Sequence, residues 1–171
     1  QEYDGIWGTL DNSIGTTNHP GATGDGVVMA EAIGAQLVGM DKIQLLPMGD
    51  PETGSLTGNI EQGVEDRIFI NKEGNRFVDE GERRDVMTKA LFEQTDDFMW
   101  IVVDKHSYPT GDTKNNFNET IDELVEAGRA YKADTLEELA EMMGVGKDNF
   151  INAVNKFNEA VDGAEDEFGR T

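Results

Sequence analysis

The sequence contains no cysteine and only two histidines, His19 and His106, among its 171 residues. Without cysteine there are no disulfides, no thiolate nucleophiles and no cysteine-ligated metal sites. Two histidines this far apart in the sequence are also too few to indicate a zinc site. These absences exclude thiol chemistry and argue against zinc chemistry in this chain.

Positive charge is scarce as well. The chain has 14 Lys and Arg residues against 35 Asp and Glu residues, which gives a formal net charge of −21 at pH 7. A nucleic-acid backbone requires a positive surface, and so does an anionic membrane. We therefore expect neither as a partner. A small anionic substrate stays compatible with this composition, because one local arginine pocket can oppose the global field.

Long apolar runs are missing too. No run approaches the roughly 20 residues that a membrane-spanning helix needs, and no signal peptide is visible. We expect no membrane insertion of this segment. Because both ends of the sequence look like cuts within a longer polypeptide, the missing export signal leaves the compartment open, and cytoplasmic and exported or cell-envelope locations both fit.

The residues that are present suffice for one domain with a real core. Hydrophobic residues make up 37% of the chain, and 20 glycines indicate many turns. Aromatic and β-branched residues recur throughout the sequence, which argues against wholesale disorder.

Residues 71–85, which read NKEGNRFVDEGERRD, are the most distinctive stretch. The apolar residues 68–70 lead into a turn around Gly74, and the chain returns through Phe77 and Val78, a pattern that predicts a β-hairpin. Arg83 and Arg84 follow at its exit, just before a helical pattern. By composition alone, the crowded charges would indicate a solvated turn with surface ion pairs.

Residues 17–26 form a turn-rich loop before a predicted helix that starts near Asp25 and ends at Gly34. A helix N-terminus preceded by glycines is a natural site for phosphate or ribose contacts, although helix capping alone explains Asp25 equally well. We expect His19 to hold this loop through a ring hydrogen bond.

Two further strands are predicted. Residues 36–48 look extended, with Ile43, Leu45 and Leu46 as a buried strand. The continuous apolar run 98–103 is the best candidate for a central strand buried on both faces.

The last third of the chain is predicted to be helical. Apolar spacing and capping residues indicate helices near 86–94, 118–128, 135–144 and 148–163, with Asn118, Thr135 and Asp148 as caps, and residues 131–133 read as a short strand. These elements together predict an α+β fold, in which a small mixed or antiparallel sheet carries helices packed on it.

The string N-K-E-G-N-R-F-V-D-E-x-x-R-R-D resembles the clamp (capping) domain of the FAD-dependent fumarate reductase and succinate dehydrogenase flavoproteins. The likeness is closest to the soluble, flavocytochrome-c-like fumarate reductases. A second string, residues 17–26 (TNHPGATGDG), is similar to the family's return from its FAD-binding domain. The two motifs lie in the family's order and at nearly the family's separation.

The resemblance implies a division of the chain and a set of roles. Residues 1–26 would return from a missing FAD-binding domain, residues 27–163 would form the clamp domain, and residues 164–171 would lead back. Asp25 would contact FAD, and Arg84 would bind the substrate and donate a proton. The chain has no Gly-x-Gly-x-x-Gly in a strand-turn-helix setting, so we expect FAD in the full-length protein and not in this fragment.

The sequence departs from the family pattern at two places. Leu46-Pro47-Met48 stands where many fumarate reductases have His-Pro-Thr, whose histidine binds a substrate carboxylate. Glu61 matches a proton-relay glutamate with one residue of slippage, but Val64 stands where the relay arginine would be.

The sequence therefore predicts part of an FAD-dependent, fumarate-reductase-like oxidoreductase that reduces the C=C bond of an unsaturated dicarboxylate or another enoate. The catalytic residues would be Arg84 and Glu61, and the isolated fragment would be inactive. Two alternatives stay open. The same flavoprotein family can act on a urocanate-type or acrylate-type enoate, or the chain can be a non-enzymatic acidic binding module.

Overall fold

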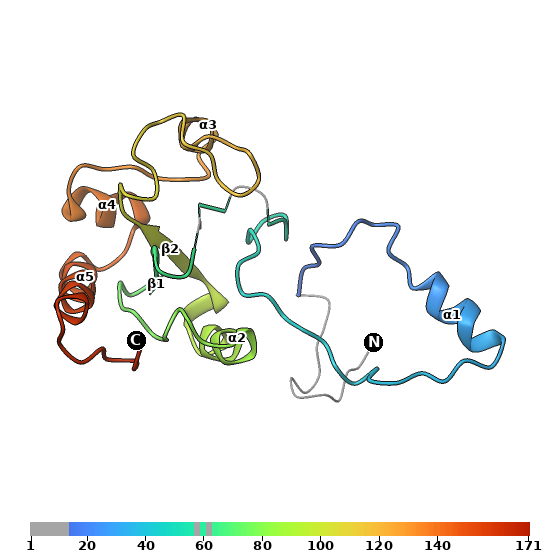
Figure 1. Ribbon diagram of the computed structural model, residues 1–171. Coiled ribbons are helices and arrows are strands. Elements are labelled where there is room, and N and C mark those ends of the chain that lie inside the picture. Colours follow the sequence, from blue (N-terminus) through green and yellow to red (C-terminus); the bar gives the residue numbers. More distant parts are fainter. Residues whose placement is uncertain (1–13, 57–58, 61–62) are drawn as a thin grey trace.

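The structure is a computed structural model, and it describes residues 14–56, 59–60 and 63–171. The elements follow one another in the order α1 (Asp25–Ala32), β1 (Arg67–Asn71), α2 (Arg84–Phe92), the short 3-10 helix η1 (Thr95–Asp97), β2 (Met99–Val103), α3 (Ile121–Glu126), α4 (Leu136–Met143) and α5 (Lys147–Val161). Figure 1 shows the strands and α2, α4 and α5 grouped together, with α1 projecting to one side.

The two strands form one antiparallel sheet, in which Phe69 lies opposite Ile101 and Ile70 lies opposite Trp100. β1 is buried along its whole length, whereas β2 is half-buried. The prediction of an α+β fold with a small antiparallel sheet is confirmed. The prediction that 98–103 is the strand buried on both faces is wrong, because β1 takes that place.

Alternating side chains of β1 point to two different layers, as the strand period requires. Ile68 and Ile70 pack with Ala140 and Met143 of α4 and with Phe150 of α5.

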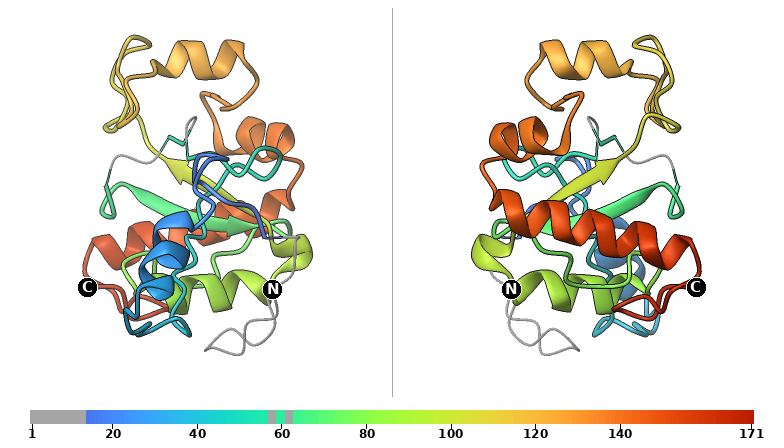
Figure 2. Two further views of the ribbon diagram at one scale, coloured as in Figure 1. Left: turned by 90° about the vertical axis from the view of Figure 1, so that its right-hand side faces the viewer. Right: turned by 90° about the vertical axis from the view of Figure 1, so that its left-hand side faces the viewer.

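Phe69 points to the opposite layer, where it packs with Val78 and with Met87 of α2. The views in Figure 2 show α5 crossing one side of the strands, with α2 below them. The sheet is thus enclosed between α4 and α5 on one face and α2 on the other.

The predicted hairpin is half right. The turn forms, because the Asn71 side chain accepts hydrogen bonds from the backbone N–H groups of Glu73 (3.1 Å) and Asn75 (2.9 Å). Phe77 and Val78 do not return as a strand, and β1 pairs with β2 instead. The physical reason is a side chain, since the N–H of Phe69 donates to Glu80 Oε1 at 3.0 Å.

Other strand and cap predictions are corrected. Residues 43–46 and 131–133 are not in strands, and Ile43 is 40% exposed. Apolar composition indicated burial there, but it carries no information about backbone pairing. Thr120 caps α3 in place of Asn118, and α5 begins at Lys147 after Gly146, so Asp148 lies inside its first turn.

The helices themselves lie close to their predicted places. α2 begins two residues earlier than expected, at Arg84, and Gly144 ends α4 in the left-handed conformation. None of the helices in the described part of the chain combines the length and the apolar composition needed to cross a bilayer.

Candidate functional site

Arg84 is the first residue of α2, and its side chain is exposed. The rest of α2 fixes this position, because Met87 and Leu91 on one face of the helix are buried. The guanidinium Nη1 donates to Gln44 Oε1 at 2.8 Å. The core thus holds the backbone of Arg84, while its charged head stays at the surface.

The three arginines of the 71–85 stretch have different surroundings. Arg76 is buried and ion-paired to Glu80 and Asp166, each at 2.8 Å. Arg83 pairs with Asp85 at 2.7 Å on the surface. Within the described residues Arg84 has no ion pair, and its hydrogen-bond partner is a neutral amide. Arg84 therefore offers an uncompensated positive charge to an anion.

The start of α2 strengthens this positive field. A helix N-terminus carries a partial positive charge, so a cation there is unfavourable for the helix. Arg83 occupies the N-cap and makes no side-chain capping bond, and Arg84 follows it directly. The carboxylate of Asp85 in the first turn accepts hydrogen bonds from Arg83 on both of its oxygens, so it is not paired with Arg84. Arg83 and Arg84 at the start of α2 are therefore unfavourable for the helix but favourable for binding a carboxylate.

Gln44 is a site residue that the sequence reading missed. It is the only polar residue in the run 43–48 (IQLLPM), and that contrast is the signal that would have revealed it. Beyond Gln44 the segment is apolar, since Leu46 is half-buried, Pro47 is buried, and Met48 packs beside the cluster of Phe69, Val78 and Met87. Residues 43–48 themselves carry no charged side chain, and the Arg67 guanidinium donates to Met48 Sδ at 3.4 Å.

The glycine-rich loop after this segment is ordered by Asp50. Asp50 Oδ1 accepts hydrogen bonds from the hydroxyl of Thr53 (2.8 Å) and from the N–H groups of Thr53 (2.8 Å) and Glu52 (3.1 Å). The bond from the Thr53 hydroxyl lowers the pKa of Asp50 most, and the backbone bonds and Arg129 add to this against the opposing effect of burial. Glu61, the predicted relay residue, lies outside the described residues.

Asp25 is exposed at the start of α1, where it accepts a hydrogen bond from the Thr23 hydroxyl at 2.8 Å. Figure 1 shows α1 apart from α2, so Asp25 and Arg84 do not share a site within this chain. His19 Nδ1 accepts from the N–H of Gly21 at 3.0 Å, which confirms that its ring holds the loop.

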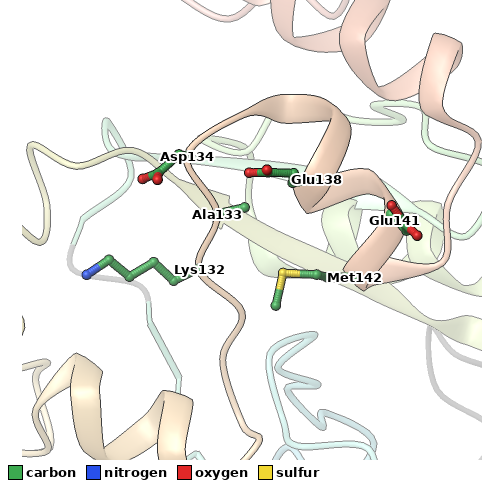
Figure 3. A pocket seen from close by; sticks show the side chains of 6 residues that line it. All are labelled: Lys132, Ala133, Asp134, Glu138, Glu141 and Met142. Carbon is green, nitrogen blue, oxygen red and sulfur yellow. The ribbon is translucent and has the colours of Figure 1, made fainter.

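An open groove of about 490 Å³ lies along α4 and the segment before it. Figure 3 shows its lining, in which Asp134, Glu138 and Glu141 outnumber the single cation Lys132. None of the predicted site residues lines it. An acidic rim repels carboxylates, so this groove is not a site for an anionic substrate. No group of three His, Asp or Glu side chains in the described ranges is placed to hold a metal ion.

The family model described as "FAD binding domain" matches residues 10–169. The chain belongs to the FAD binding domain family. In its described residues, this member of the family has the Arg84 guanidinium, without an ion pair, at the start of α2.

Curated relatives of this family member are oxidoreductases. The chain is 38% identical over 166 residues to an NADH:acrylate oxidoreductase of Vibrio harveyi, a match that covers 97% of this chain and 16% of the relative. It is 39% identical over 163 residues to a urocanate reductase of Eggerthella lenta, covering 93% and 27%.

A solved structure agrees with these relatives. The open conformation of a flavocytochrome c3 fumarate reductase matches with a TM-score of 0.65 and 29% identity, over 92% of this chain and 27% of that one. This FAD binding domain family member therefore spans about a quarter or less of the length of the proteins just named.

Proposed function

We propose that this chain is the clamp domain of a longer FAD-dependent reductase that reduces the C=C bond of an unsaturated carboxylate, with Arg84 as the proton donor. The observation that carries the proposal is the state of the Arg84 guanidinium, which is exposed and, within the described residues, bonded to the neutral Gln44 and to no carboxylate. Family membership and the reductase relatives support the same assignment.

The domain division follows the sequence reading. Residues 1–26 return from an FAD-binding domain of the same polypeptide, residues 27–163 form the clamp, and residues 164–171 lead back. An apolar surface on residues 27–40 supports this division, since Val28, Met29, Ile33 and Val38 are at least 64% exposed. An apolar surface of this kind is typical of a contact with another domain.

The residues at the start of α1 leave room for FAD. The ideal Cβ positions of Gly24 and Gly26 have no atom within 4 Å, so a cofactor can approach the backbone closely there. The exposed Asp25 carboxylate between these glycines accepts a hydrogen bond from the Thr23 hydroxyl. It can accept one from a ribose hydroxyl in the same way. We propose Asp25 as an FAD contact, and FAD, when bound, would supply the hydride.

Reduction of the double bond also needs a proton on the neighbouring carbon. Gln44 accepts a hydrogen bond from Nη1 of Arg84 and so orients the guanidinium. The other N–H groups of the guanidinium remain available to the substrate. Arg84 then holds the substrate carboxylate and donates the proton, and the closed clamp excludes water during the transfer.

An arginine is an unusual acid, because a free guanidinium holds its proton far above neutral pH. Proton donation is feasible when the carbanion that develops is strongly basic and a relay returns the proton promptly. We propose Glu61 as a member of that relay. Its replacement by Gln should slow turnover and leave substrate binding unchanged.

Among enoates, one observation favours acrylate-type or urocanate-type acids over fumarate. Leu46, Pro47 and Met48, which follow Gln44 in the chain, are apolar, so none of their side chains can pair with a second substrate carboxylate. Burying a carboxylate without a partner costs free energy, so a substrate with a single carboxylate fits this apolar segment better.

The role of Arg84 is tested by steady-state kinetics of the longer flavoprotein with a reduced dye as electron donor. We expect Arg84→Lys to bind FAD normally and to lose about 10²- to 10⁴-fold in turnover, as for removal of a general acid. The control is Arg83→Lys, which removes the bidentate ion pair with Asp85 on the surface and should keep turnover within about twofold. Wild-type rates in Arg84→Lys would refute the assignment.

The substrate class is tested by a panel of fumarate, acrylate and urocanate with the same donor. We expect higher kcat/KM for the monocarboxylates. Leu46→His should then raise kcat/KM for fumarate. If no enoate is reduced while FAD is bound, the chain is a non-enzymatic acidic module and not a reductase clamp.

A further inference from the structure

Four charged side chains form a cluster inside the domain, and the proposed reaction uses none of them. Glu80 is 0% exposed, Arg76 is 3%, Asp166 is 4% and Arg170 is 12% exposed. We call them the buried ion cluster. Two positive and two negative groups make the cluster neutral overall.

Both oxygens of the Glu80 carboxylate are fully used. Oε1 accepts from the N–H of Phe69 at 3.0 Å and from Arg76 Nε at 2.9 Å. Oε2 accepts from Arg76 Nη2 at 2.8 Å and from Arg170 Nη1 at 2.9 Å. Glu80 therefore joins β1, the connection after β1 and the C-terminal segment at one point.

The connection from Arg76 to Arg83 has no strand or helix of its own. Glu80 bonds it to the sheet through its side chain and through its carbonyl, which accepts from Arg67 Nη2 at 2.8 Å, and Val78 packs against Phe69. Arg84 follows four residues after Glu80. The place at which the chain enters α2, and with it the place of the Arg84 guanidinium, depends on this attachment.

Arg170 ties the C-terminal segment to the same point. Its guanidinium donates to the carbonyls of Arg67 (2.7 Å), Val64 (2.8 Å) and Glu65 (3.1 Å) at the start of β1. Asp166 completes the connection, since it pairs with Arg76 and accepts from the N–H of Arg170 at 3.2 Å.

One aromatic ring contacts both guanidiniums. The Phe157 ring of α5 lies 4.9 Å from the guanidinium carbon of Arg76 and 4.9 Å from that of Arg170. Each arginine thus gains a cation–π contact in addition to its ion pair. The helix α5, the C-terminal segment and the connection that leads to Arg84 meet at this ring.

Stability alone is a weak reason for such a cluster, because well-packed apolar side chains often stabilise a core as much as a buried ion pair does. We infer that Glu80, Arg76 and Arg170 are positioning residues, which fix the Arg84 guanidinium relative to the C-terminal segment that leads toward the rest of the polypeptide. This inference rests on the proposed role of Arg84.

The test uses the longer flavoprotein with bound FAD and compares Glu80→Gln, Arg170→Met and Arg170→Lys. A displacement of a reacting group by about 1 Å costs up to about 100-fold in rate. We expect Glu80→Gln and Arg170→Met to lower kcat by about 10- to 100-fold with little change in KM, at temperatures well below each variant's Tm. Dye-driven reduction of FAD should stay within twofold of the wild-type rate.

Arg170→Lys keeps the positive charge and a hydrogen-bond donor, so it should recover most of the kcat that Arg170→Met loses. A loss of folded protein alone would not give this pattern. Glu82→Gln is the matched control for Glu80→Gln, since Glu82 is exposed and outside the cluster. If Arg170→Met and Glu80→Gln bind FAD and keep kcat within twofold while only their Tm falls, the positioning role is wrong. That result, combined with an inactive Arg84→Lys, would leave the proposed function intact, whereas an active Arg84→Lys would overturn the function itself.

Discussion

Gly74 shows how one residue fixes the turn that follows β1. Its φ is +91°, and a Cβ at this position would lie 2.7 Å from the carbonyl oxygen of Gly146 and 3.1 Å from the backbone nitrogen of Phe150. Both neighbours are backbone atoms at the start of α5, so they cannot turn away as a side chain would. The close approach also brings Asn149 Nδ2 within 2.8 Å of the Glu73 carbonyl.

Replacement of Gly74 by alanine should therefore destabilise the domain in two ways. The left-handed conformation costs about 1–2 kcal/mol for an L-residue, and the clash adds about 1–3 kcal/mol. Gly128→Ala is the matched control, because Gly128 has φ +70° with no atom within 4 Å of its Cβ position. Urea unfolding should show a larger loss for Gly74→Ala than for Gly128→Ala, and equal losses would contradict the close packing.

Asp166 makes the stability of the domain depend on pH. Burial alone would raise the pKa of Asp166, but hydrogen bonds from Arg76 and from the N–H groups of Phe168 and Arg170 outweigh it and hold this pKa below its usual value. A carboxyl whose pKa is lowered by folding stabilises the folded state above its usual pKa of about 3.9, and this stabilisation is lost as pH falls through the folded value.

Asp166→Asn should reduce the free energy of unfolding at pH 7 by about 3 kcal/mol, because it leaves a buried arginine without one of its charged partners. The difference from wild type should narrow as the pH falls below about 4, where the carboxyl of the unfolded wild type takes up a proton, and it should go on narrowing down to the lower pKa of the folded state. The control is Glu165→Gln at the exposed neighbouring position. A difference that stays constant between pH 7 and pH 3 would contradict this account.

The elements differ in how far the sequence could predict them. Turn and capping residues act locally, so the turn at Gly74 and the helix that Thr135 caps lie where their residues indicate. The partner of β1 could not be predicted, because Glu80 takes the N–H that a returning strand would have used. Arg84 was found through its motif, whereas Gln44, 40 residues earlier, becomes its neighbour only through tertiary contact.

The capping of α4 gives a prediction at the scale of the element. The Thr135 hydroxyl accepts from the N–H of Glu138 at 3.2 Å, and α4 places Ala140 and Met143 against β1. Thr135→Ala should lower the free energy of unfolding by about 1 kcal/mol, since the N–H loses its partner. Thr135→Ser keeps the hydroxyl and should stay within about 0.5 kcal/mol of wild type in urea unfolding. An equal loss in both variants would show that the methyl group matters and the cap does not.

The whole molecule has an uneven distribution of apolar surface. The core lies around β1 between α2, α4 and α5. In contrast, α1 has no buried residue, and Ile33 and Val38 after it are 88% and 80% exposed. We propose that another domain of the same polypeptide covers this surface.

Ile33→Asn and Val38→Asn should each change the stability of this chain by no more than about 0.5 kcal/mol, because these side chains are exposed. Leu91→Ala, in the core, is the reference and should cost about 2–5 kcal/mol. In the longer flavoprotein the same Ile33→Asn should cost about 1.5–3 kcal/mol, the value of a buried isoleucine. An unchanged unfolding transition in the longer protein would mean that nothing covers this surface.

Proton donation by Arg84 is the central step of the proposed reaction, and single-turnover reoxidation of reduced FAD by an enoate measures this step most directly. The longer flavoprotein is reduced without oxygen and mixed rapidly with acrylate, and flavin absorbance is followed in wild type, Arg83→Lys and Arg84→Lys. We predict wild-type reoxidation in Arg83→Lys and a rate about 10²- to 10⁴-fold lower in Arg84→Lys, with FAD still bound. Equal reoxidation rates in all three proteins would contradict the assignment of Arg84 as the proton donor.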